Sequence, residues 1–144
     1  GAQNSTGGQS AGAGYLIFGP AEGDLALGSA DLIIRGDQES QFAAAGLGAG
    51  DLDQDGKAEI LLGAPGDETA GDHAGAVYLF LEPSPGIYSV GDADLTLAGE
   101  VGSEAGWGLG VGDMDGDGSP EIIVGAPEET TGGSAAGAIY LFSL

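Results

Sequence analysis

The stretch Asp51-Leu52-Asp53-Gln54-Asp55-Gly56-Lys57-Ala58-Glu59 decides the fold, and Ile60-Leu61-Leu62-Gly63-Ala64-Pro65 follows it directly. The pattern returns 62 residues later as Asp113-Met114-Asp115-Gly116-Asp117-Gly118-Ser119-Pro120-Glu121, which Ile122-Ile123-Val124-Gly125-Ala126-Pro127 follows. Each nonapeptide has acidic residues at positions 1, 3, 5 and 9 and a glycine at position 6. A glycine there permits the sharp turn that brings the acidic side chains together.

These acidic residues have the pattern of a calcium-binding loop. Carboxylate oxygens on a tight loop suit Ca²⁺, whereas zinc and copper prefer nitrogen and sulfur. The sequence therefore predicts two calcium sites per chain, each completed by water. The predicted ligands of the first site are the side chains of Asp51, Asp53, Asp55 and Glu59 and the carbonyl of Lys57. Those of the second site are the side chains of Asp113, Asp115, Asp117 and Glu121 and the carbonyl of Ser119.

Two other interpretations of the loops agree less well with the sequence. A single acidic run is often only a solvated turn, but two copies at fixed spacing favour an ion site. An EF-hand would have a bidentate glutamate at position 12, between two helices. Position 12 is instead Leu62 or Val124, inside an aliphatic run typical of a strand. Each loop is therefore expected to lead into a β-strand.

The composition excludes several classes of function. The 144 residues include 23 Asp and Glu against 2 Lys and Arg, so the net charge is −21. Nucleic acids and anionic membrane surfaces should repel such a chain. Cysteine is absent, which removes disulfides, cysteine-ligated zinc and thiol catalysis. No apolar run approaches the ~18 residues of a membrane span, so membrane insertion is not expected.

Several segments recur at the same spacing as the acidic loops. The strand-like segment at 14–18 returns at 77–80 and again at 139–142, and the segment at 30–36 returns at 93–99. The repeat is therefore about 62 residues long, and no segment has a sustained helical period. The complete repeat contains four short strand candidates separated by turn residues. They lie near 44–50, 59–63, 76–81 and 94–98.

Four strands per repeat without helices predict an all-β fold of β-propeller blades, each made of four antiparallel strands. Counting strands from the acidic hairpin, residues 1–41 form a partial blade with strands 3 and 4. Residues 42–104 form a complete blade, and residues 105–144 form a partial blade with strands 1 to 3. The chain therefore holds about two blades.

The acidic loops, the Gly-Ala-Pro segments at 63–65 and 125–127 and the strands at 75–80 and 137–142 together resemble the FG-GAP repeat. This repeat is the blade of the integrin alpha-chain β-propeller. The resemblance covers nearly the whole chain and implies a calcium-stiffened, extracellular module for adhesion or for binding a protein or glycan. It implies a secreted or cell-surface location. Because the acidic residues are duplicated in two equivalent loops, the chain is not expected to be an enzyme.

The chain departs from the family pattern in three ways. Ala43-Ala44 and Ala105-Gly106 stand where the Phe-Gly dipeptide is expected, so nearby Phe42 and Trp107 are expected to supply aromatic packing. The ninth loop position is Glu where the family usually has Asp. Family propellers usually have seven blades, whereas this chain holds about two.

Two blades cannot close a ring, because propellers typically have at least about four. The expectation is a homo-oligomer in which strands 3 and 4 of one chain complete strands 1 and 2 of the next. The alternative is a structural or assembly fragment, natural or designed, without a ligand of its own. A glycan-active hydrolase is disfavoured, because a catalytic site is normally unique whereas these acids are duplicated. Such an enzyme would also want arginines for an anionic sugar, and Arg35 is the only arginine.

Overall fold

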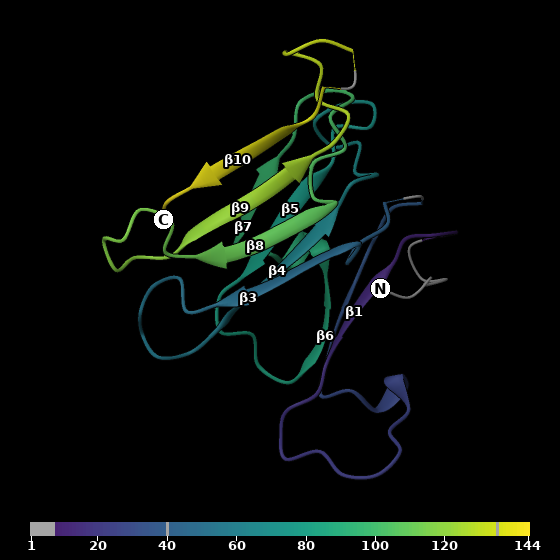
Figure 1. Cartoon of the computed structure of the whole chain (residues 1–144). Helices are drawn as coiled ribbons and strands as arrows, with labels where there is room; N and C mark the ends of the chain where they lie inside the picture. Colours follow the sequence, from purple (N-terminus) through teal and green to yellow (C-terminus); the bar gives the residue numbers. More distant parts are fainter. Residues whose placement is uncertain (1–7, 40, 135) are drawn as a thin grey trace.

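The structure is a computed structural model that describes residues 8–39, 41–134 and 136–144. The described residues form three small β-sheets with two short 3-10 helices and no α-helix (Figure 1). The strands are β1 (Ala13–Leu16), β2 (Leu32–Arg35), β3 (Gly46–Gly50), β4 (Glu59–Ala64), β5 (Ala76–Phe80), β6 (Gly86–Ser89), β7 (Leu95–Ala98), β8 (Gly108–Gly112), β9 (Glu121–Ala126) and β10 (Ala138–Phe142). The 3-10 helices are η1 (Leu27–Ser29) and η2 (Val90–Asp92).

The central sheet has the strand order β3-β4-β5-β7, and all its neighbouring strands are antiparallel. Its four strands lie in the four predicted ranges. Hydrophobic residues of β4 and β5 are buried on both faces of this sheet, as expected for a blade enclosed by two neighbours. The prediction of an all-β fold with a complete four-stranded blade is confirmed.

The two outer sheets are partial blades. Strands β8, β9 and β10 form an antiparallel sheet equivalent to strands 1 to 3, and β1 and β2 pair as strands 3 and 4. All five strands lie within the segments assigned to partial blades. The boundaries at 41/42 and 104/105 stay predictions.

Strand β6 was not predicted from the sequence. It lies in the loop between β5 and β7, yet it pairs in parallel with β2 of the first partial blade. The loop continues into η2, whose start is fixed by a capping box between Ser89 and Asp92. Val90, the first residue of η2, is almost completely buried. The loop of the complete blade therefore extends the sheet of its neighbour.

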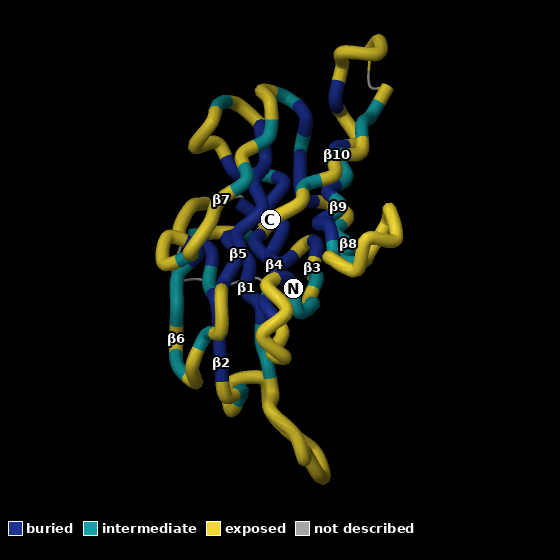
Figure 2. Tube along the Cα trace, turned by 90° about the vertical axis from the view of Figure 1, so that its left-hand side faces the viewer, coloured by how far each residue is buried: buried dark blue, intermediate teal, exposed yellow. Residues whose placement is uncertain are grey.

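Two hydrophobic clusters lie between the three sheets, and Figure 2 shows the buried residues concentrated there. The first joins β2 to one face of the central sheet, and the second joins the other face to β9. Glycine allows the closest approach: a Cβ on Gly63 would lie 1.9 Å from the carbonyl oxygen of Gly106. The blades therefore pack face to face with their backbones in contact.

The contact between neighbouring blades occurs twice with the same geometry. An isolated parallel bridge joins Gly12 to Ala43 at the first interface, and an equivalent bridge joins Gly75 to Ala105 at the second. The first bridge becomes the second when each residue is shifted by one repeat. The chain thus contains two successive steps of one propeller-like arrangement.

In the two C-terminal blades, a tyrosine of strand 3 donates a hydrogen bond to an acidic residue. The buried Tyr78 hydroxyl donates a hydrogen bond to Asp67 at 2.6 Å, and the Gln41 side-chain amide donates to the same carboxylate oxygen at 2.6 Å. One repeat later, the Tyr140 hydroxyl donates to Glu129 at 2.9 Å. Each tyrosine therefore ties its strand to the loop that precedes it.

Candidate metal centres

The first candidate centre lies in the hairpin between β3 and β4. Asp51 follows the last residue of β3, and Glu59 is the first residue of β4. Asp51, Asp53 and Glu59 each offer a carboxylate oxygen, and the three oxygens lie within 4.8 Å of one another. The hairpin therefore brings loop positions 1, 3 and 9 together.

The second candidate centre has the same construction between β8 and β9. Oxygens of Asp113, Asp115 and Glu121 also lie within 4.8 Å of one another. The same three loop positions converge in both hairpins, although the sequences between them differ. This agreement is expected if both loops are shaped for one kind of ligand.

Backbone amides hold the first acid of each loop. The Gly56 N–H donates to Asp51 at 3.0 Å, and the Gly118 N–H donates to Asp113 at 3.0 Å. Gly56 has φ +91° and Gly118 has φ +94°. Glycine adopts this region without steric cost, so the glycine at position 6 is required by the turn.

The closing glutamate of the first loop is buried with an unsatisfied oxygen. Glu59 has no exposed surface, and its Oε2 accepts a hydrogen bond from the Leu52 N–H at 2.5 Å. Among the described residues, Glu59 Oε1 and Asp51 Oδ1 are buried oxygens without a hydrogen-bond partner. Burying a carboxylate oxygen without a partner is costly, so this pair of oxygens is suited to a cation.

Glu121 has the equivalent place in the second loop. It is 3% exposed, and its Oε2 accepts a hydrogen bond from the Met114 N–H at 2.7 Å. In both loops one oxygen of the glutamate is therefore held by the backbone. Both loops have Glu at position 9, where the family usually has the shorter Asp. The carboxylate of this longer side chain still lies close to those of the acids at positions 1 and 3.

The acids at position 5 lie outside these clusters. Asp55 accepts hydrogen bonds from the Lys57 N–H at 2.8 Å and the Lys57 Nζ at 3.2 Å, and Lys57 Nζ also pairs with Glu82 at 2.5 Å. Glu82 and, to a smaller extent, Asp55 raise the pKa of Lys57. In the second loop, Asp117 accepts from the Ser119 N–H at 2.7 Å. Ligation by Asp55 and Asp117, and by the carbonyls of Lys57 and Ser119, stays a prediction.

A third acidic group lies on the surface. Glu68, Asp72 and His73 are all exposed, and His73 Nδ1 lies 2.9 Å from an Asp72 oxygen. This hydrogen bond raises the pKa of His73. The group has no buried oxygen and no counterpart among the repeated loops, so it does not share the features of the two hairpin sites.

The prediction that Phe42 and Trp107 supply core packing is wrong. Phe42 is 45% exposed and Trp107 is 50% exposed, and Trp107 Nε1 donates to Glu104 at 2.8 Å. Ala43 and Ala105 are buried at the interfaces, where the parallel bridges bring two backbones together. The close backbones leave room for a methyl group but not for an aromatic ring.

None of the described residues form a helix that is long and apolar enough to cross a membrane.

Comparison with known proteins identifies the repeat. The FG-GAP repeat model matches residues 42–80 and 105–142, which is more than half of the chain. Each matched segment contains one of the two candidate centres. The match therefore falls on the hairpins described above and on the strand that follows each of them.

Individual proteins share this similarity over longer stretches. The chain is 30% identical over 138 residues to human phosphatidylinositol-glycan-specific phospholipase D, an alignment that covers 89% of this chain and 16% of that protein. It is 34% identical to human integrin alpha-7 over 104 residues, covering 71% of this chain and 9% of the integrin. It is 37% identical to Xenopus laevis integrin alpha-5 over 112 residues, covering 73% and 10%.

The chain thus spans about a sixth or less of the length of these relatives. The repeat model, the integrin similarity and the sheets with their acidic hairpins agree with one another. The chain belongs to the FG-GAP repeat family, as two repeats of an integrin alpha-type β-propeller.

Proposed function

We propose that this chain is a calcium-stabilised β-propeller module of an extracellular protein, used for adhesion or for binding a protein or glycan ligand. Calcium binding is supported mainly by two buried carboxylate oxygens, one on Asp51 and one on Glu59, that have no hydrogen-bond partner among the described residues. They lie beside the Asp53 carboxylate in a loop whose counterpart gathers the same three acids. Several carboxylates held this close repel one another unless a cation lies between them.

The residues that would hold calcium are Asp51, Asp53 and Glu59 in the first hairpin and Asp113, Asp115 and Glu121 in the second. Bound calcium supplies positive charge that offsets the repulsion among these carboxylates. Because Asp51 follows β3 and Glu59 begins β4, ligation by both fixes the ends of two strands. Binding free energy thereby becomes stability of the blade hairpins.

The adhesion or ligand-binding part rests on the similarity to integrin alpha chains. An extracellular location is proposed on the same basis. Outside cells the calcium concentration is high enough to fill sites as weak as those of other extracellular modules. A glycan array and a panel of candidate protein ligands, both screened in calcium buffer, would separate a binding module from a structural spacer. Binding that disappears on chelation would support the proposal, and no binding to any ligand would favour the spacer.

We further propose that the chain has no catalytic site of its own. One set of relatives is named as phospholipases, but this chain corresponds to 16% of their length. Its buried acids are duplicated in two equivalent hairpins. Assaying phospholipase D activity on a glycosyl-phosphatidylinositol substrate tests this directly, and turnover by the purified chain would overturn it.

Isothermal titration with calcium tests the metal proposal. We expect two equivalents per chain, with dissociation constants on the order of 10⁻⁴–10⁻³ M, as in other extracellular modules. Glu59→Gln should remove one equivalent and Glu121→Gln the other. Binding of no calcium at millimolar concentration by the folded chain would refute the proposal.

A further inference from the structure

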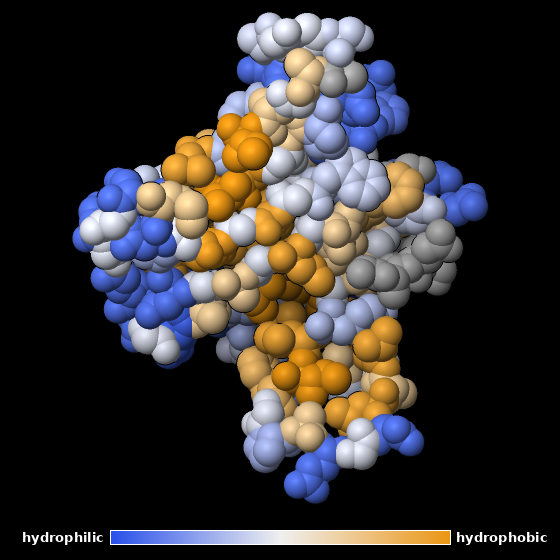
Figure 3. Space-filling view, in the orientation of Figure 1, coloured by the Kyte–Doolittle hydropathy of each residue, from blue (hydrophilic) through white to orange (hydrophobic). Residues whose placement is uncertain are grey.

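The two acidic hairpins lie side by side, because the strands that lead into them are in contact. Figure 1 places the loop after β3 next to the loop after β8, and Figure 3 shows hydrophilic side chains gathered on that side of the molecule. Gly48 and Gly50 lie on one face of β3, against side chains of β8. A Cβ on Gly50 would lie 2.4 Å from Val111, so a larger residue would force the two strands apart.

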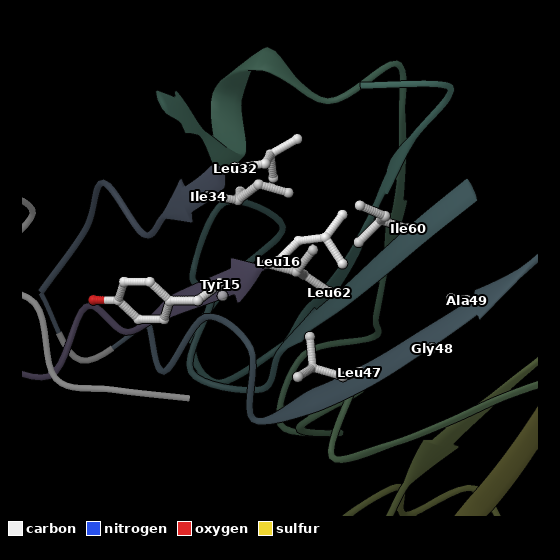
Figure 4. A pocket seen from close by; sticks show the side chains of 10 residues that line it. Tyr15, Leu16, Leu32, Ile34, Leu47, Gly48, Ala49, Ile60 and Leu62 are labelled. Atoms are coloured by element: carbon white, nitrogen blue, oxygen red, sulfur yellow. The ribbon is translucent and has the colours of Figure 1, made fainter. Parts of the chain in front are cut away.

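The opposite face of the first hairpin is apolar. On this face Leu47 pairs with Leu62, and Ala49 pairs with Ile60. Figure 4 shows Ile60 and Leu62 beside Leu16 of β1, where they line a cavity of about 310 Å³. All residues that line the cavity belong to β1–β4, so it takes no part in the contact between the acidic loops. The glycine face of β3 therefore sets the distance between these loops.

A direct hydrogen bond joins the two loops. The side-chain amide of Gln54, at position 4 of the first loop, donates to the carbonyl oxygen of Gly118 at 3.1 Å. Gly118 is at position 6 of the second loop, and the two residues are 64 apart in the sequence. The hydrogen bond therefore links one candidate centre to the other across the interface between two blades.

Gln54 has a backbone conformation that is unfavourable for its residue type. Its φ is +61°, a left-handed value that residues other than glycine seldom adopt. The equivalent residue of the second loop is Gly116, with φ +81°. The turn thus needs a left-handed residue in both copies, yet the first copy has glutamine there. Such local strain is found most often at functional sites, and here the side chain that glycine lacks is the part that reaches the other loop.

Gly118 connects this hydrogen bond to acids of the second centre. Its N–H donates to Asp113 at 3.0 Å, while its carbonyl accepts from Gln54. The next N–H, that of Ser119, donates to Asp117 at 2.7 Å. Gln54 therefore holds a peptide unit whose neighbouring amides orient the acids at positions 1 and 5 of the second loop.

Gln54 is equally close to the ligands of its own centre. It directly follows Asp53, one of the three converging acids of the first loop. The Asp55 N–H donates to Asp53 at 3.1 Å, so Gln54 is the middle residue of a turn that closes on this acid. An ion held by Asp53 would restrict the backbone of Gln54 and hence the position of its side chain.

We infer that Gln54 couples the two candidate centres, so that calcium bound in one hairpin raises the calcium affinity of the other. This inference rests on the calcium binding proposed above. An ion in the first hairpin orders Gln54, and the hydrogen bond to Gly118 then orders the second loop before its own ion binds. Because less conformational entropy remains to be lost, the second ion binds more tightly. Linkage makes the effect reciprocal, so either ion strengthens the other by the same factor.

The coupling should have the size of one exposed hydrogen bond. Such a bond between neutral groups changes an equilibrium constant about twofold to tenfold. Part of the bond already exists before either ion binds, so only the remaining part contributes to the coupling. We therefore expect a coupling factor of about threefold.

Isothermal titration with calcium measures this factor through a mutant cycle. Glu59→Gln leaves the second site alone, and Glu121→Gln leaves the first. The overall constant for binding both ions to the unmodified chain should exceed the product of the two single-site constants about threefold. In a Gln54→Met background, which keeps the side-chain length but has no donor, the two quantities should be equal. Gln54→Gly should give the same equality, although it removes the backbone strain instead of keeping it.

Gln38→Met is the matched control. Gln38 is also an exposed glutamine, and its amide donates to the Thr69 hydroxyl at 3.2 Å, outside both hairpins. This variant should keep the threefold excess of the unmodified chain. Two independent sites in the unmodified chain, or an excess that survives Gln54→Met, would overturn the inference and leave the calcium proposal intact. Absence of any calcium binding would overturn both.

Amide chemical shifts test the route of the coupling. In the Glu121→Gln chain only the first hairpin binds calcium. Adding calcium should nevertheless shift the amide resonances of Gly118 and Ser119, and these shifts should vanish when Gln54→Met is added. Shifts that persist with Gln54→Met would come from the field of the ion, and unshifted resonances in Glu121→Gln would mean that the hydrogen bond transmits nothing. Either result would overturn the role of Gln54.

Discussion

At the scale of single residues, Glu59 is a buried carboxylate that the fold only half satisfies. Its Oε2 is held by the Leu52 N–H, while among the described residues its Oε1 has no partner. Replacing Glu59 by glutamine removes the charge at nearly constant volume. Without calcium, Glu59→Gln should therefore be at least as stable as the unmodified chain. With calcium, it should gain about half as much in melting temperature, because one of two sites is lost.

Melting curves in chelator and in millimolar calcium measure this difference for Glu59→Gln. Glu121→Gln serves as the matched variant in the second hairpin. A Glu59→Gln chain that is less stable in chelator and gains the full calcium increment would show that the carboxylate serves the apo fold instead of an ion.

Tyr78 is a second residue whose role follows from its contacts. Burial and the nearby Asp67 raise the pKa of the Tyr78 hydroxyl, so it stays protonated and donates to that carboxylate. Burial raises the pKa of Asp67, but hydrogen bonds from Tyr78, Gln41 and Thr69 outweigh it and lower the pKa. Tyr78→Phe removes one of these donors from a buried acceptor and should cost about 1–3 kcal/mol of stability.

Urea unfolding gives this value, and Tyr140→Phe is the control. Tyr140 makes the equivalent hydrogen bond to Glu129 but is only half buried, so its removal should cost less. Equal losses for the two variants would mean that burial does not set the strength of the hydrogen bond.

At the scale of elements, the turn after β9 depends on an ionised glutamate. The Thr131 hydroxyl and N–H donate to Glu129 at 2.7 and 2.6 Å, and these bonds, with that of Tyr140, lower the pKa of Glu129 to about 2. Because the folded pKa lies below the unfolded value of 4.5, ionised Glu129 contributes stability above pH 4.5. That contribution is lost as the pH falls toward 2.

The melting temperature should therefore fall between pH 5 and pH 2 by more in the unmodified chain than in Glu129→Gln. Experiments in chelator keep calcium release from contributing to the difference. Parallel acid curves for the two chains would contradict the role given to Glu129.

The elements also show what the sequence could and could not predict. The strands of the central blade were predictable because each is a short apolar run flanked by glycine-rich or acidic turns, and this pattern recurs after about 62 residues. The convergence of Asp51, Asp53 and Glu59 followed from their loop positions, whereas Asp55 turns toward Lys57, a contact that spacing does not encode. Strand β6 escaped prediction because its partner β2 is remote in the sequence and belongs to another repeat.

At the scale of the whole molecule, a net charge of −21 opposes compaction, so binding of a divalent cation is expected to have a large effect on stability. Two bound ions would reduce the charge to −17. At a calcium concentration of ten times the dissociation constant, each site stabilises the fold by about 1.4 kcal/mol. Adding chelator should therefore lower the melting temperature, most strongly at low ionic strength, where repulsion is least screened.

Calorimetric scans at several salt concentrations, each with calcium and with chelator, test this effect. Magnesium at the same concentration separates specific ligation from simple screening, since Mg²⁺ demands a tighter and more regular coordination shell. A thermal transition that is insensitive to chelator at every ionic strength would contradict calcium stabilisation.

The parallel pairing of β6 with β2 has a consequence for how this chain can be divided. A cut between residues 41 and 42 would follow the sequence repeat, yet it would strip β6 of its partner and uncover Val90. We therefore expect that a single 62-residue repeat cut at this boundary would be less stable than the same repeat within the whole chain. A single repeat would lack the strand that β6 pairs with in the preceding repeat. We therefore expect that engineered proteins of this kind need several repeats in tandem to fold stably.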